Sequence, residues 1–192
     1  MLILSKSILN VPIMSLQTGT RLGTSGTPII DPATLTIMAF FVNGAGGTQQ
    51  EPHVLMANNV REVGQMGMII DAIDDLSPLS DLVRLQEIIA LHFDVMGLTV
   101  IDEEKNKLGK VVDYSLDPTT FTIHKLYLKP PLLKSFQTHT SQISRHQIVE
   151  VNNNTIIVRS ATVKEQAQNR ITSGEFINPF RSPQPKSQSD VD

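Results

Sequence analysis

The heptapeptide Asp31-Pro-Ala-Thr-Leu-Thr-Ile37 recurs later in the chain as Asp117-Pro-Thr-Thr-Phe-Thr-Ile123. The two copies lie 86 positions apart, and Leu22-Gly23 recurs at Leu108-Gly109 with the same offset. Asp-Pro is a turn signal, because the Asp side chain bonds to its own backbone and Pro presets φ. The Thr-rich segment after each turn favours a β-strand. We therefore interpret the chain as two copies of one small β unit.

The match between the two copies continues toward the end of each unit. Residues 60–63 match 148–151 at an offset of 88, and 68–70 match 155–157 at an offset of 87. Small changes of offset are what loop insertions produce. The alternative explanation is that β-proteins reuse Asp-Pro turns and Thr-Ile strands without being related.

Short strands separated by turns account for the second copy. The charged segment 102–107 predicts a hairpin turn, and Asn152-Asn-Asn154 predicts another, because Asn tolerates positive φ. In the first copy, Ser25-Gly-Thr-Pro28 replaces part of a strand, so we expect that strand to be bulged or shortened. The strands expected in the second copy are 98–101, 108–114, 121–128, 148–151 and 155–158. Such a series of short strands predicts a small barrel or sandwich.

One helix is expected between the two copies. Ser77-Pro78 or Ser80 can cap its start, and Leu82, Leu85 and Ile89 follow helical spacing. We interpret it as a linker helix that packs on one of the barrels, and a partner-binding helix is the alternative. The predicted organisation is all-β, with a first repeat at 1–76, the linker helix at 77–92, a second repeat at 93–160 and a tail at 161–192.

The tail is rich in Gln, Ser, Asn and Pro. It has little apolar surface to bury, so we expect it to be disordered. An apolar island, Phe176-Ile-Asn-Pro-Phe180, interrupts it. The island is either a short docking motif or a chance cluster.

The composition excludes several classes of protein. The chain has no cysteine, which rules out disulfides, thiolate nucleophiles and the common zinc sites. The net charge of −3 provides no global basic field for nucleic acid. No segment approaches the ~18 apolar residues of a membrane span, and the apolar N-terminal run is too short for a signal peptide. We expect a soluble, cytoplasmic protein.

The spaced scaffold residues of the second copy resemble the PRC-barrel family. They are Gly97-Leu-Thr-Val-Ile-Asp102, Lys107-Leu-Gly-Lys-Val-Val-Asp113 and the Asp117 heptapeptide, followed by 148–158. The family takes its name from the cytoplasmic domain of the photosynthetic reaction-centre H subunit, and it includes the C-terminal domain of the bacterial ribosome maturation factor. The resemblance covers roughly residues 5–160. It implies two tandem PRC-barrel-like β-barrels that dock onto protein complexes, and no catalytic residues carry over.

Side chains that could support catalysis are scattered. Gly44-Ala-Gly-Gly47 lacks the Gly-Lys-Ser/Thr of a phosphate loop, so we interpret it as a flexible connection. Asp71, Asp74 and Asp75 form an acidic cluster, which we expect to solvate the linker and favour the helix N-terminus. The five histidines, none at the spacing of a metal-binding helix, are His53, His92, His124, His139 and His146. We therefore expect no enzyme, no cofactor and no metal site.

The distribution of charge points to a candidate binding surface. Residues 118–149 contain no Asp or Glu but several cations, and a Pro-rich apolar stretch lies among them. This composition is typical of a surface that docks an acidic protein or an RNA backbone. The alternative is a solvated loop whose apolar residues cover the end of the barrel. The candidate partner-binding residues are Lys125, Lys129, Leu132, Leu133, Lys134, Phe136 and Arg145.

Three functions follow as hypotheses. The first is a non-catalytic cytoplasmic adaptor that presents its loops and edges to a protein partner. The second is a ribosome- or RNA-associated assembly factor that docks through the basic 118–149 segment. The third is a small-molecule binder with its site between the barrels. A large polar pocket at the junction would favour the third hypothesis, and a packed apolar junction would weigh against it.

Overall fold

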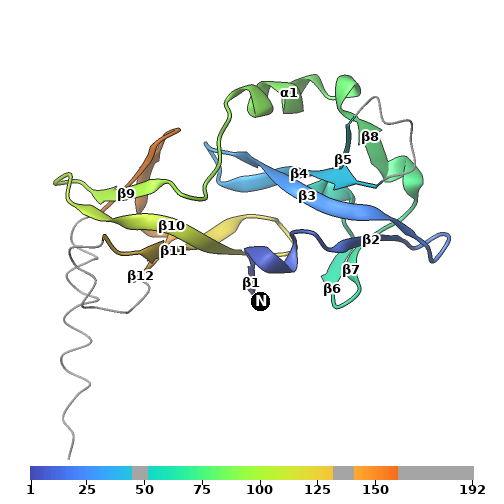
Figure 1. Ribbon diagram of the computed structural model, residues 1–192, viewed down its shortest axis with the longest axis horizontal. Helices are drawn as coiled ribbons and strands as arrows, with labels where there is room; N and C mark the ends of the chain where they lie inside the picture. The colour runs from blue at the N-terminus through green and yellow to red at the C-terminus, as the bar shows by residue number, and fades with distance from the viewer. Residues whose placement is uncertain (45–51, 132–140, 160–192) are drawn as a thin grey trace, which may run out of the picture. The chain divides into compact units, whose positions relative to one another are not determined.

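The computed structural model describes residues 1–44, 52–131 and 141–159 and consists mainly of two β-sheets (Figure 1). Within these residues each sheet has seven strands, and the only α-helix is α1 (Val83–Ala90). The prediction of an all-β chain is confirmed. Closure of each half into a barrel stays a prediction, as do the PRC-barrel resemblance and the domain boundaries. The tail at 161–192, with its Phe176–Phe180 island, lies outside the described residues.

The first sheet is built from the first half of the chain, in the order β6-β7-β2-β3-β4-β5-β8. All of its strand pairs are antiparallel except β2 with β7, which are parallel. Its strands are β2 (Pro12–Ser15), β3 (Arg21–Asp31), β4 (Thr36–Asn43), β5 (His53–Met56), β6 (Glu62–Gly64), β7 (Gly67–Ile70) and β8 (Leu76–Pro78).

The second sheet has the order β12-β11-β10-β9-β14-β13, and the N-terminal strand β1 (Ile3–Leu4) pairs separately with β10. Its other strands are β9 (Thr99–Asp102), β10 (Lys107–Leu116), β11 (Ile123–Lys129), β12 (Ser141–Ser144), β13 (Ile148–Val151) and β14 (Thr155–Val158). Short 3₁₀ turns connect the strands: η1 (Ser5–Ser7), η2 (Ala57–Asn59), η3 (Ile73–Asp75), η4 (Leu79–Asp81) and η6 (Arg145–Gln147).

The two sheets share one strand order and, in most pairs, one register. β13-β14-β9-β10-β11-β12 repeats β6-β7-β2-β3-β4-β5, and the parallel pair β9–β14 repeats β2–β7. The long strand pairs also shift register at equivalent places, once after Ser25 and once after Val111. The strand through Ser25-Gly-Thr-Pro28 is therefore bulged, as expected, and the extra residue of the second bulge is Val112.

The two Asp-Pro turns have the local structure that their sequence predicts. The Ala33 N–H donates to Asp31 Oδ1, and the Thr119 N–H donates to Asp117 Oδ1, each at 2.9 Å. The bond from Thr119 is the main cause of a pKa of Asp117 below its ordinary value. Each carboxylate thus closes its turn and fixes the start of the strand that follows.

The turns from the two halves meet each other at the junction between the sheets. The Ile37 N–H donates to the Phe121 carbonyl at 3.0 Å, and the Ile123 N–H donates to the Leu35 carbonyl at 2.9 Å. These bonds are reciprocal, because Phe121 and Ile123 are the repeat equivalents of Leu35 and Ile37. Leu35 and Phe121 share a positive φ, at 48° and 54°.

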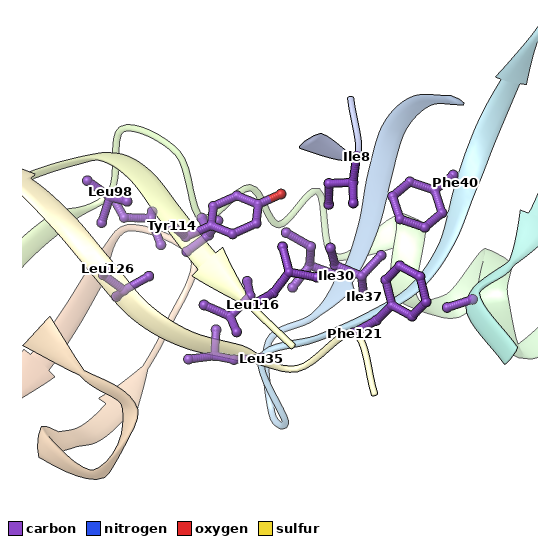
Figure 2. Close-up of a cluster of buried hydrophobic side chains, with 14 of the residues drawn as sticks. Ile8, Ile30, Leu35, Ile37, Phe40, Leu98, Tyr114, Leu116, Phe121 and Leu126 are labelled. Atoms are coloured by element: carbon purple, nitrogen blue, oxygen red, sulfur yellow. The ribbon is translucent and has the colours of Figure 1, made fainter. Parts of the chain in front are cut away.

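Apolar side chains fill this junction, and Figure 2 shows those of both halves in one cluster. The rings of Phe40 and Phe121 meet edge to face, with their centroids 5.6 Å apart. Leu35, Ile37 and Leu116 lie around them and are at most 4% exposed. Both sheets belong to one compact unit, Met1–Ser160. Burial of this much apolar surface is the main force that holds the two halves together.

The connection between the halves differs from its prediction at its start. Ser77 and Pro78 belong to β8, which pairs with β5, and the helix begins only at Val83 after Leu82, without a side-chain cap. Strand pairing therefore outweighs the capping signal. Leu85 is buried against β3, β4 and β5 of the first sheet, together with Leu82 and Ile89. Figure 1 shows α1 lying over this sheet. The apolar stripe thus packs on a sheet, as the linker interpretation requires.

The acidic cluster stabilises the loop before β8 and not the helix. Asp71 forms an ion pair with Arg61, in which Nη2 lies 2.7 Å from Oδ2, and this partner lowers the pKa of the Asp71 carboxyl. Asp75 Oδ2 accepts hydrogen bonds from the backbone N–H groups of Asp71 and Ala72. The expected role at the helix N-terminus is wrong, because β8 and η4 lie between the cluster and α1.

Candidate docking surface on the second sheet

Only part of the predicted binding segment lies within the described residues. Lys125, Lys129 and Arg145 are described, whereas Leu132, Leu133, Lys134 and Phe136 fall within the undescribed stretch 132–140. The structure places the three described cations in different surroundings. Each of them is therefore considered by itself.

Lys125 lies in the middle of β11. It is half-buried and stands opposite Ser115 of β10 and Ser144 of β12. Its position in a three-stranded ladder holds its backbone firmly. Among the described residues it forms no ion pair with a carboxylate.

Arg145 lies at the junction of the two halves. It opens η6, and its Nη1 donates to the Ile123 carbonyl at 3.4 Å. Together with Glu150, Pro32 and Leu35 it lines a pocket of about 300 Å³ that includes residues of both sheets. Arg145 therefore contributes to the junction and is not part of the surface around Lys129.

Lys129 ends β11 at the side of an open groove. Its direct cross-strand partner is Lys110 of β10. The groove has a volume of about 500 Å³, and most of its lining is apolar. We call it the lysine groove; its residues are Gly97, Lys107, Gly109, Lys110, Val111, Val112, Lys129, Pro130 and Pro131.

Backbone features shape this groove. A Cβ at Gly109 would lie 2.4 Å from the carbonyl oxygen of Lys129, so only glycine lets the two strands approach here. Val112 is the bulge residue, so it interrupts the alternation of inward- and outward-facing side chains along β10. It is 44% exposed beside the groove. Bulges commonly redirect a side chain in this way. The result is an apolar floor bordered by cations.

Lys107 and Lys110 are not among the predicted binding residues, because in the sequence they belong to a scaffold pattern. They lie outside the acid-free segment, and it is the register of β10 against β11 that brings Lys110 opposite Lys129. This register could not be predicted from the sequence, because two bulges shift it in opposite directions between Leu116 and Lys110. A signal was available in Gly109, since a glycine within a strand often marks a close backbone approach.

On the first sheet, Arg21 is the equivalent of Lys107, but the pair equivalent to Lys110 and Lys129 is neutral. Thr24 and Asn43 are direct cross-strand partners, as Lys110 and Lys129 are in the second sheet. The Thr24 hydroxyl donates to the Asn43 carbonyl at 3.3 Å, so a hydrogen bond joins the two residues of this pair. Two cations in register are therefore a feature of the second copy. The fold does not require them, because the first copy has the same strand pairing without them.

The junction holds another pocket besides the one that Arg145 lines. A second pocket, of about 270 Å³, combines the turn at Thr119 and Thr120 with Met56 and Asn58 of the first half. The apolar cluster around Phe40 and Phe121 fills the space between the sheets. Across the described parts of the chain, no three His, Asp or Glu side chains gather in a way that could hold a metal ion.

Comparisons with known proteins leave the family of this chain open. No family model matches it, and no curated protein matches it either. Within the described ranges, no helix has the length and apolar character needed to cross a membrane.

Proposed function

We propose that this chain is a non-catalytic adaptor whose two β units are held together by the shared apolar junction and present their outer surfaces to a protein partner. The observation that carries the proposal is the lysine groove, an exposed, largely apolar groove bordered by three cations. Surfaces that combine an apolar floor with a charged rim are typical of protein-binding sites. The resemblance to PRC-barrel proteins, whose members dock onto other complexes, supports the same function.

Cross-linking in native extract tests this function. The intact protein is treated with a lysine-reactive cross-linker, and the products are identified by mass spectrometry. We expect one protein to be recovered in stoichiometric amount, with cross-links at Lys107, Lys110 or Lys129. A chain with a measurable turnover activity and no stoichiometric partner would contradict the adaptor proposal.

Association with ribosomes or RNA is a second candidate function, favoured by the facing pair Lys110 and Lys129. Lysines in register attract phosphates, and binding of this kind weakens steeply with salt. Its test is co-sedimentation with ribosomal particles at low salt, with Lys107, Lys110 and Lys129 changed to Glu as the comparison. If the unaltered protein never co-sediments, this candidate is wrong.

Binding of a small molecule between the units is the least supported candidate. Apolar side chains pack at the junction, and the pockets at Thr120 and at Arg145 are smaller than the lysine groove. A ligand that shifts the amide resonances of Thr120 or Arg145 in solution would support this candidate function.

A further inference from the structure

We infer that the lysine groove binds an acidic peptide segment that also carries apolar side chains. The inference deepens the proposed adaptor function and rests on it, because it names the chemistry of the partner. It starts from the charge of the groove: Lys107, Lys110 and Lys129 border it, and none of the described residues that line it is acidic.

The cations of the groove have no carboxylate beside them in its described lining. Lys107, Lys110 and Lys129 are exposed, and the described residues that line the groove with them are glycine, valine and proline. Like charges directly opposite each other on a sheet are unfavourable. The first copy avoids this cost with Thr24 and Asn43 at the equivalent positions. A bound carboxylate between Lys110 and Lys129 would turn the repulsion into attraction.

The lining of the groove selects among anionic partners. Val112, Pro130 and Pro131 provide apolar surface, which favours a ligand with apolar side chains. None of the described residues that line the groove is aromatic, and stacking on aromatic side chains is the usual platform for single-stranded nucleic acid. An acidic peptide with apolar side chains can pair with the lysines and also pack on the apolar floor. A phosphate backbone can only pair with the lysines.

Binding to the intact chain is measured by amide resonances in two-dimensional NMR. The probe is a peptide of about ten residues that alternates Asp with Leu, a length that spans an extended groove. We expect resonances of Gly97, Gly109 and Val112 to shift on titration. We also expect the affinity to fall at least roughly tenfold between about 50 mM and about 200 mM salt.

Matched ligands separate the apolar contribution from the charge. A peptide that alternates Asp with Gly has the same charge, and an oligouridylate of equal charge represents a nucleic acid. We expect both to bind at least roughly tenfold more weakly than the Asp-Leu peptide. Equal or tighter binding of either one would overturn the inference, as would the absence of any groove shift with the Asp-Leu peptide.

Matched variants localise the site. In the variant Lys110→Glu/Lys129→Glu the affinity for the Asp-Leu peptide should fall at least roughly tenfold. The control Lys6→Glu/Arg84→Glu alters the net charge equally at exposed positions outside the groove and should change the affinity less than about twofold. Equal losses in the two variants would overturn the inference, because the attraction would then come from net charge alone.

Failure of this inference is distinguishable from failure of the adaptor function. A stoichiometric partner that cross-links only elsewhere on the chain leaves the adaptor function standing and removes the groove from it. Peptide binding in the groove of a chain with turnover activity and no protein partner has the opposite meaning: the site stands and the adaptor function fails.

Discussion

Thr36 and Thr122, which occupy the same position in the two halves of the chain, face each other in an isolated antiparallel bridge. Their hydroxyl oxygens lie 3.5 Å apart, and the residues are 86 positions apart in the sequence. The backbone bonds on either side exchange Ile37 with Phe121 and Ile123 with Leu35. The same segment of each copy therefore forms the junction, and the two segments pair with each other.

The first prediction concerns the ring of Phe121. It is 2% exposed and meets Phe40 edge to face, so Phe121→Ala leaves a cavity at the centre of the junction. We expect the free energy of unfolding to fall by about 3–5 kcal/mol. Urea denaturation, followed by circular dichroism, measures the change.

The control for this prediction is Val112→Ala, at an exposed position. It should change the free energy of unfolding by no more than about 0.5 kcal/mol. Because the two sheets share one apolar cluster, the unaltered protein should unfold in a single transition. Two separate transitions, with Phe121→Ala affecting only one, would show that the halves are independent.

The second prediction concerns the pair Lys110 and Lys129. The change Lys129→Glu places opposite charges in register, so stability should rise by about 0.5 kcal/mol while affinity for the Asp-Leu peptide falls. Urea denaturation at low salt and at about 1 M salt measures the gain, which screening should remove.

The control here is Lys125→Glu on the same strand. Lys125 stands opposite Ser115 and Ser144 and has no cation in register, so this change should give no comparable gain in stability. A rise of equal size in both variants would mean that the facing lysines do not repel each other measurably.

The third prediction concerns Gly109. In the variant Gly109→Ala, a methyl group would meet the Lys129 carbonyl and push β11 away from β10. We expect a loss of about 1–3 kcal/mol in the free energy of unfolding, which chemical denaturation measures. The comparison is Gly64→Ala, where the nearest atom is a side-chain oxygen of Glu62 at 3.4 Å. Similar losses at both positions would show that the close approach is unimportant.

The fourth prediction concerns the phenol of Tyr114, which is 1% exposed and has no hydrogen-bond partner among the described residues. Figure 2 shows its ring among the buried apolar side chains. Removing an unsatisfied buried hydroxyl relieves its desolvation cost, so Tyr114→Phe should leave stability unchanged or raise it by about 1 kcal/mol.

The same phenol makes stability depend on alkaline pH. Burial raises the pKa of Tyr114 above its ordinary value. The folded state therefore retains the phenolic proton at a pH where the unfolded chain releases it. The resulting stability is present below about pH 10 and is lost as the pH rises further. Denaturation curves at several alkaline pH values should show a steeper loss for the unaltered protein than for Tyr114→Phe. Parallel losses would contradict this assignment.

Some parts of the fold were predictable because their signals are local. The Asp-Pro turns need only the Asp carboxylate and the N–H two residues later, and the strands at 148–151 and 155–158 have the predicted bounds. The helix start was wrong, because Ser77 is taken into β8 by pairing with the distant β5. Local capping signals carry no information on such a partner.

The candidate site was predictable only in part for a related reason. The acid-free segment identified Lys129, but Lys110 joins it through a register that two opposing bulges set. The same segment grouped Arg145 with Lys129, although Arg145 bonds to the Ile123 carbonyl at the junction. Nearness in the sequence therefore identified one lysine of the facing pair and not the other.

The reciprocal bonds between the two turns have the form of an isologous contact, the kind by which identical subunits make a closed dimer. In a chain that contains both copies, association no longer depends on protein concentration, because the tether supplies a high effective concentration. It also removes the requirement that both copies be identical. Ala57 of η2 and Arg145 of η6 begin equivalent turns yet differ in charge and size. The linked pair can thus evolve as a heterodimer would, with one copy free to specialise while the other preserves the shared contact.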